Sequence, residues 1–157
     1  MTESTNWELT LTRVFDAPRE RVFKAWIDPQ LLARWWGPRG FSTPVAELDV
    51  QPGGKLNIVM EDSEGLIEKG SRYPMEGVFR EIVEPQRLVY EASPLMNGKP
   101  FMDTLMTVTF EEQDGKTKLT LHILVTNITP EAAGPLSGME MGWNQSFDKL
   151  VEFLGKK

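Results

Sequence analysis

The chain has 157 residues, of which 40% are hydrophobic and 25% charged, with a net charge of −6 and a pI near 4.9. A domain of this size buries roughly 68–70% of its unfolded surface, so we expect a single domain over residues 1–157, with residues 1–6 flexible. The acidic balance argues against nucleic acid as a partner, because phosphate binding needs clustered Lys and Arg. No apolar run reaches the roughly 18 residues of a membrane span, and residues 1–6 have no signal-peptide pattern, which predicts a cytoplasmic protein without stable membrane insertion.

Two residue types that carry much of enzyme chemistry are almost absent from the sequence. There is no cysteine, which excludes disulfides, thiol nucleophiles and thiolate metal sites, and the single histidine is His122. His122 lies between Leu121 and Ile123 in an alternating segment, so it should face away from the core, which argues against catalysis through its ring. We therefore expect neither a metal nor a cofactor.

The first elements along the chain are a strand and two short helices. Residues 8–15 alternate between polar and apolar side chains, as in a half-buried strand. Pro18 suits the first position of a helix that buries Trp26, because proline has no N–H to lose there. The pair Asp28-Pro29 repeats the pattern and predicts a second short helix, which should carry Trp35 and Trp36.

After Gly37-Pro38 the hydrophobic period changes to two, and turn-forming residues separate the segments. Asp114-Gly115, for example, is typical of a two-residue hairpin. A final helix should run from about Met139 to Leu154, because Gly134, Pro135 and Gly138 weaken its earlier turns. The expected strands are 43–50, 54–61, 69–83, 87–93, 102–112 and 117–127. The class is α+β, with a curved antiparallel sheet of about seven strands wrapped around the long C-terminal helix.

Strand alternation also predicts which side chains face the terminal helix. This face is rich in methionine and aromatic residues, and methionine adapts to varied ligands, although filling of a core is an equally direct interpretation. A tyrosine hydroxyl such as that of Tyr90 could orient a ligand in a mostly apolar pocket. The predicted lining of a ligand cavity is Trp36, Met60, Met75, Phe79, Tyr90, Met106, Phe110, Trp143 and Phe147.

Acidic residues offer two further candidate sites. Glu61, Asp62, Glu64 and Glu68 lack the spacing of a calcium loop, so we interpret them as a solvated hairpin tip. Glu81 could act as a general acid or base only if a strand bulge turned it inward, where burial would raise its pKa. Its orientation stays open at this stage.

Several segments together resemble a known superfamily. They are Arg34-Trp35-Trp36-Gly37-Pro38, Pro52-Gly53-Gly54 and the late Gly142-Trp143. The chain resembles the START-like, or SRPBCC, helix-grip superfamily, and within it small bacterial proteins named after the C-terminal domain of the activator of the heat-shock chaperone ATPase. The resemblance implies a cavity between sheet and terminal helix for apolar or amphipathic small molecules. It implies no shared catalytic motif.

Three functional hypotheses follow. The first is a non-enzymatic binder of an apolar or aromatic small molecule or lipid. The second is a cofactor-free enzyme of the cyclase or hydrolase type that uses Tyr90 or an inward Glu81 for proton transfer. The third is a protein-partner role, either chaperone regulation or formation of a homodimer. Of these we favour the first.

Overall fold

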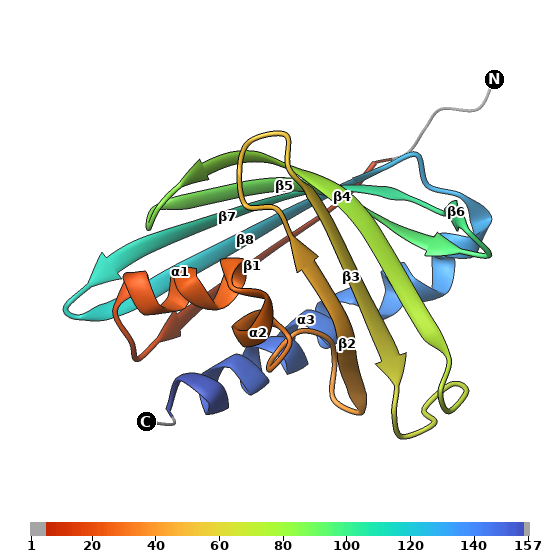
Figure 1. Cartoon of the computed structure of the whole chain (residues 1–157), viewed down its shortest axis with the longest axis horizontal. Coiled ribbons are helices and arrows are strands. Elements are labelled where there is room, and N and C mark those ends of the chain that lie inside the picture. The colour runs from red at the N-terminus through yellow and green to blue at the C-terminus, as the bar shows by residue number, and fades with distance from the viewer. Residues whose placement is uncertain (1–5, 156–157) are drawn as a thin grey trace.

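The computed structural model describes residues 6–155 and confirms the α+β helix-grip architecture (Figure 1). Residues 1–5, on which most of the predicted flexible segment falls, lie outside this range. The elements are β1 (Trp7–Phe15), α1 (Arg19–Ile27), α2 (Pro29–Leu32), β2 (Phe41–Leu48), β3 (Lys55–Asp62), β4 (Arg72–Val83), β5 (Arg87–Met96), β6 (Lys99–Pro100), β7 (Asp103–Gln113), β8 (Lys116–Thr126), a 3₁₀ turn (Pro130–Ala132) and α3 (Ala133–Leu154).

One antiparallel sheet carries the fold. Its strand order is β1-β8-β7-β5-β4-β3-β2, with the short β6 paired to β5, so β1 and β2 are its two edges. Figure 1 shows the sheet curving over α3, while α1 and α2 connect the two edge strands. The sheet is open, and α3 with the two short helices covers its inner face.

The turn chemistry explains the hairpins. Asp114 and Gly115 both have positive φ, 52° and 80°, and they join the paired residues Gln113 and Lys116 of β7 and β8, as predicted. Asn97 and Gly98 make a similar turn that pairs β5 with β6. This two-residue strand was not predicted from the sequence.

The helix boundaries differ in detail from the prediction. Pro18 is the N-cap of α1, with extended φ and ψ, and not its first helical residue. Asp28 does cap α2, since its Oδ1 accepts hydrogen bonds from the N–H groups of Gln30 (2.9 Å) and Leu31 (3.4 Å). However, α2 ends at Leu32, so Trp35 and Trp36 lie in the turn that follows it.

The terminal helix begins at Ala133 and not near Met139. Pro135 falls in its first turn, where proline removes no helical hydrogen bond, and this placement makes an early start compatible with the sequence. The helix therefore starts before Gly134 and Gly138, despite the low helix propensity of glycine. The first part of α3 is therefore helical without strong intrinsic preference for helix.

The inner face of the sheet is the one that alternation predicted. Leu56, Ile58, Phe79, Leu88, Tyr90, Met106, Val108, Phe110, Leu119, Leu121, Ile123 and Val125 are all buried. Met60 and Met75 are partly buried against the same core. On the opposite face, His122 is partly exposed and its Nε2 lies 3.1 Å from the Glu8 carboxylate. The outward orientation of His122 is therefore confirmed.

Candidate functional site

The space between α3 and the sheet is occupied by a cluster of aromatic rings centred on Trp26. The Trp143 ring of α3 stacks on Trp26 almost in parallel, with centroids 5.9 Å apart and an angle of 11°. Trp35 (4.8 Å), Trp36 (6.2 Å) and Phe147 (6.5 Å) surround Trp26 at steeper angles. These contacts join α1, the turn after α2 and the terminal helix.

A small cavity remains beside this cluster. Its volume is about 10 Å³, which is close to the space that one water molecule needs. The walls come from the turn after α2, the inner face of the sheet and α1. The lining residues are Trp26, Leu32, Trp36, Leu48, Leu56, Ile58, Phe79, Leu88 and Tyr90.

Two polar atoms of residues that line this cavity have no partner. The Tyr90 hydroxyl and the Trp26 indole Nε1 are buried, and within residues 6–155 neither makes a hydrogen bond. Leaving such a group unpaired costs about 1–3 kcal/mol. Trp35, by contrast, donates from Nε1 to the Ala25 carbonyl at 3.0 Å. Two residues of the cavity lining thus carry a donor without a partner in the described part of the chain.

Burial also fixes the protonation state of Tyr90. Removal of the ring from water raises the pKa of the phenol far above its ordinary value, because the charged phenolate would be poorly solvated. The hydroxyl therefore stays protonated at ordinary pH. It can donate a hydrogen bond to a ligand but does not act as a base.

The structure places the nine predicted lining residues in three groups. Trp36, Phe79 and Tyr90 line the small cavity. The rings of Phe110, Trp143 and Phe147 lie around Trp26. The methionines are Met106, buried and paired with Tyr90 across β5 and β7, and the partly buried Met60 and Met75. Their role in binding stays a prediction.

Trp26 itself was not among the predicted lining residues. The sequence placed it in the buried stripe of the first helix, and a buried tryptophan on a helix is usually explained by packing alone. Its position became informative only when its unpaired Nε1 and the facing Trp143 were seen together. The sequence gives no signal for either feature.

Glu81 and Glu91 both lie on the outer side of the sheet and not in the interior. The pairing of β4 with β5 shifts between Phe79 and Glu81, but this irregularity leaves Glu81 exposed and paired with Arg87 at 2.8 Å. The possibility of an inward Glu81 was therefore wrong. Glu91 is likewise paired on the outer side, with Arg80.

The hairpin between β3 and β4 is exposed over residues 63–70, as interpreted from the sequence, but Asp62 at its base is an exception. Asp62 is fully buried, and its two carboxylate oxygens accept hydrogen bonds of 2.7–2.9 Å from four consecutive backbone N–H groups, those of residues 65–68. Burial opposes ionisation, but these N–H groups outweigh it and lower the pKa of Asp62. Asp62 therefore organises the loop. Within residues 6–155, no three His, Asp or Glu side chains are grouped as a metal site would require.

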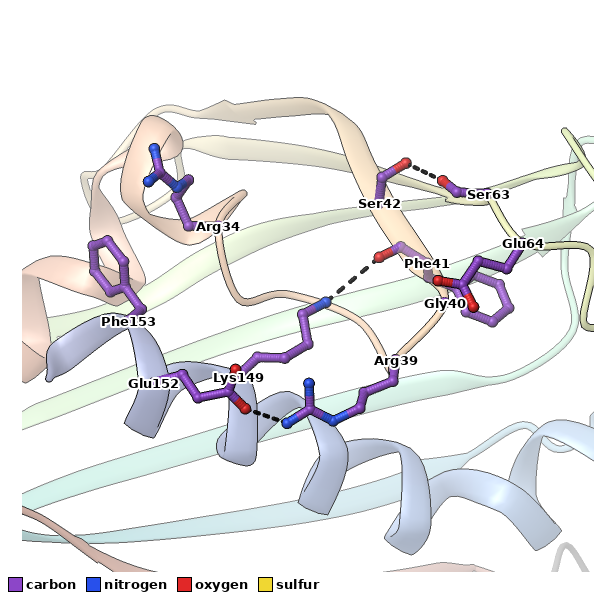
Figure 2. A pocket seen from close by; sticks show the side chains of 10 residues that line it. All are labelled: Arg34, Arg39, Gly40, Phe41, Ser42, Ser63, Glu64, Lys149, Glu152 and Phe153. Atoms are coloured by element: carbon purple, nitrogen blue, oxygen red, sulfur yellow. Dashed lines mark hydrogen bonds and ion pairs between the residues drawn. The ribbon is translucent and has the colours of Figure 1, made fainter. Parts of the chain in front are cut away.

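A larger hollow lies on the outside of the fold (Figure 2). This outer cleft has a volume of about 520 Å³ and is bounded by the residues that precede and begin β2, the β3–β4 loop and the last turns of α3. Its lining residues are Arg34, Arg39, Gly40, Phe41, Ser42, Ser63, Glu64, Lys149, Glu152 and Phe153. None of them belongs to the lining predicted from the sequence.

Lys149 lies at the centre of the outer cleft. Its Nζ donates to the carbonyl oxygens of Gly37 (3.0 Å), Trp36 (3.4 Å) and Phe41 (3.5 Å), and Figure 2 shows the side chain reaching from α3 toward Phe41. Burial, and next the nearby charge of Arg39, lower the pKa of Lys149, although Glu152 opposes them. The lysine thus anchors the end of α3 to the segment that precedes β2.

A curved antiparallel sheet closed by a long C-terminal helix defines a START-like fold, of the kind that in general binds ligands. The chain belongs to the family described as activator of Hsp90 ATPase homolog 1-like proteins, whose model matches residues 16–155. No curated protein sequence matches the chain significantly. The resemblance drawn from the tryptophan and glycine motifs is confirmed.

Solved structures support the same assignment. A Chromobacterium violaceum protein is 29% identical, with a TM-score of 0.80, and the match covers 96% of this chain and 98% of that one. A Nitrosomonas europaea protein is 26% identical, with a TM-score of 0.73 and coverage of 94% and 93%. A Silicibacter pomeroyi protein named AHSA1 is 24% identical, with a TM-score of 0.74 and coverage of 94% and 97%, a likeness of fold alone.

Across residues 6–155, no helix combines the length and the apolar character that crossing a bilayer would demand.

Proposed function

We propose that the protein is a cytoplasmic binder of an apolar or aromatic small molecule or lipid that carries a hydrogen-bond acceptor, held between the sheet and α3. The observation that carries this proposal is the pair of unpartnered donors, the Tyr90 hydroxyl and the Trp26 Nε1, at one apolar cavity. Indole is a donor only, and Tyr90 stays protonated, so a carbonyl, ether or hydroxyl oxygen of a ligand would satisfy both. The apolar remainder of the lining suits a hydrocarbon or aromatic body.

Binding requires the cavity to enlarge. Its present volume of about 10 Å³ is far below the roughly 300–1,000 Å³ of small-molecule sites. Trp143 is the side chain whose displacement would open it, because it is partly exposed and stacks directly on Trp26. The surrounding part of α3, residues 133–145, contains no buried residue. We therefore place ligand entry at the first half of α3.

Ligand-dependent stabilisation tests the proposal. Fatty acids, sterols, flavonoids and aromatic metabolites are screened by thermal unfolding, and a ligand present at 100 times its Kd adds about 2.7 kcal/mol to the stability of the folded protein. A ligand that displaces Trp143 also changes the tryptophan fluorescence. If no member of such a set shifts the unfolding temperature, the proposal fails.

A matched pair of variants locates the binding site. Tyr90→Phe removes the hydroxyl while keeping the ring, and it should weaken a ligand found in the screen roughly 3- to 10-fold, the effect of one lost hydrogen bond. Tyr73→Phe is the control, because the Tyr73 hydroxyl already accepts a hydrogen bond from Ser71 (2.9 Å). Equal affinities of the two variants would place the ligand elsewhere.

The two alternatives stay predictions. For an enzyme of the cyclase or hydrolase type, Tyr90 stays protonated and Glu81 is exposed, so neither serves as a general base in the interior. A chaperone-regulating or homodimeric role would need an exposed apolar surface. Leu66 and Ile67 of the β3–β4 loop, which are 63% and 74% exposed, are the candidates for such a contact. The mass in solution and co-sedimentation with a chaperone decide this second alternative.

A further inference from the structure

The outer cleft and the interior cavity have no lining residue in common. With a volume of about 520 Å³, the outer cleft falls within the size range of small-molecule sites without any movement of α3. It is therefore a candidate for a second ligand, with its own chemistry.

The walls of the outer cleft are fixed by backbone contacts. Ser63 and Glu64 donate from their N–H groups to the Gly40 carbonyl at 3.0 and 3.2 Å, which ties the β3–β4 loop to the segment before β2. Asp62 holds that loop from inside. The N–H of Arg39 donates to the Gln145 side chain at 3.1 Å and fixes the same segment to α3. A ligand would meet a formed site.

The charge in the outer cleft has the opposite sign to that of the whole chain. Arg34, Arg39 and Lys149 face two carboxylates, Glu64 and Glu152, which leaves a local net charge of +1 in a chain of net charge −6. Within residues 6–155, no carboxylate lies within ion-pair distance of Lys149, whose hydrogen bonds go to neutral carbonyls. The three N–H donors of Lys149 are thus occupied, but its positive charge still attracts an anion bound nearby.

Glu152 already shows how an anionic group fits. Its carboxylate pairs with the Arg39 guanidinium across the outer cleft, as Figure 2 shows, and both side chains are at least half exposed. An exposed ion pair contributes little to stability, so another carboxylate can replace it at small cost. Glu152 occupies the position that a ligand anion would take.

The outer cleft also offers apolar contact. The rings of Phe41 and Phe153 are half buried in its walls, and the Arg34 guanidinium lies over Phe153 with its central carbon 5.9 Å from the ring centroid. A flat or hydrocarbon body can pack against these rings. Ser42 and Ser63, hydrogen-bonded to each other at 2.7 Å, add hydroxyls at the rim.

We propose that the outer cleft binds a small organic anion, a carboxylate or phosphate on an apolar body, whose anionic group displaces Glu152 from Arg39 and lies in the positive field of Lys149. The apolar body packs on Phe41 or on Phe153, which Figure 2 shows at opposite ends of the outer cleft. The outer cleft is separate from the interior site of the proposed function. It selects an anionic ligand by charge, whereas the interior site does not.

Calorimetric titration with naphthalene-2-carboxylate and the neutral naphthalene-2-carboxamide tests the charge requirement, and inorganic phosphate and acetate test the anion alone. The naphthoate should bind at least roughly 10-fold more tightly than the amide, since it alone forms charge-assisted hydrogen bonds. Added NaCl should weaken it, because the site is exposed to solvent. Equal binding of acid and amide would overturn the proposal, whereas tight binding of phosphate alone would support the anion site and remove the apolar contact.

Three variants locate the naphthoate. Arg39→Gln should weaken its binding roughly 10-fold, and Glu152→Gln should strengthen it several-fold by removing the competing carboxylate. Arg80→Gln is the matched control, because Arg80 forms a similarly exposed pair with Glu91 outside the outer cleft. If Arg80→Gln and Arg39→Gln weaken binding equally, or Glu152→Gln weakens it, the outer cleft is not the site. If Tyr90→Phe weakens naphthoate binding and Arg39→Gln does not, the probe binds in the interior, which overturns this inference and supports the proposed function.

Discussion

The two halves of α3 are held in different ways, although they form one continuous helix. Residues 133–145 contain no buried side chain and include Gly134, Gly138 and Gly142. Residues 146–154 bury Ser146, Phe147, Leu150 and Leu154 against the core. Local stability follows buried apolar contact and helix propensity, so the second half should remain docked under conditions in which the first half opens. Under the proposed function, the first half of α3 would admit the ligand while the second half keeps the helix attached to the core.

The largest expected effect is in the second half. Phe147 is fully buried, against Phe15 at 5.7 Å and the Trp26 cluster, so Phe147→Ala should lower the free energy of unfolding by about 3–5 kcal/mol. Denaturant titration measures this loss. Leu136→Ala, at a partly buried position of the first half, is the comparison variant and should cost much less. Equal losses would show that the two halves are docked alike.

A stabilising change is expected in the first half. A Cβ added at Gly138 meets no atom within 4 Å, so Gly138→Ala should gain up to about 1 kcal/mol of helix propensity without a clash. The gain should appear as slower amide hydrogen exchange in residues 133–145. If the ligand enters through this half of α3, the same change should also slow ligand binding. Gly77→Ala is the opposite case, because its Cβ would lie 1.8 Å from the Glu91 carbonyl oxygen. An unchanged exchange rate in Gly138→Ala would mean that this half is already rigid.

The smallest effect concerns pH. The lowered pKa of Lys149 means that the unfolded chain binds its proton more tightly than the folded protein does. Protonated Lys149 therefore lowers the free energy of unfolding. This loss of stability is fully present at neutral pH and disappears as the pH rises through the lowered pKa of Lys149 toward the ordinary value of 10.5. Lys149→Met should therefore remove a small rise in stability at alkaline pH. Urea titrations of both proteins across that range measure it, and identical pH slopes would contradict the assignment.

Most of the fold could be predicted because it depends on local patterns. Period-two alternation identified the inner face of the sheet, and Asp114-Gly115 identified the β7–β8 hairpin. The predicted start of α3 is too late because the glycines at 134 and 138 have low helix propensity. In the structure, the 3₁₀ turn at Pro130–Ala132 leads directly into α3, and the helix begins there despite these glycines. Local conformation was thus more predictable than the exact ends of the elements.

The sites were less predictable because they depend on contacts between distant segments. Arg39 and Lys149 meet only after α3 has docked beside the segment before β2, and no spacing in the sequence indicates this. Asp62 looked like one charge among several at a hairpin tip. Only the folded loop shows four N–H groups converging on its carboxylate.

The nearly parallel rings of Trp26 and Trp143 give the protein an optical property of its own. Trp26 and Trp143 belong to a cluster of indoles that also contains Trp35 and Trp36, so the transitions of these rings should couple and contribute to the circular dichroism of the folded protein. Displacement of Trp143 from the cluster should change that contribution. Opening of the helix can therefore be followed spectroscopically in the unlabelled wild-type chain.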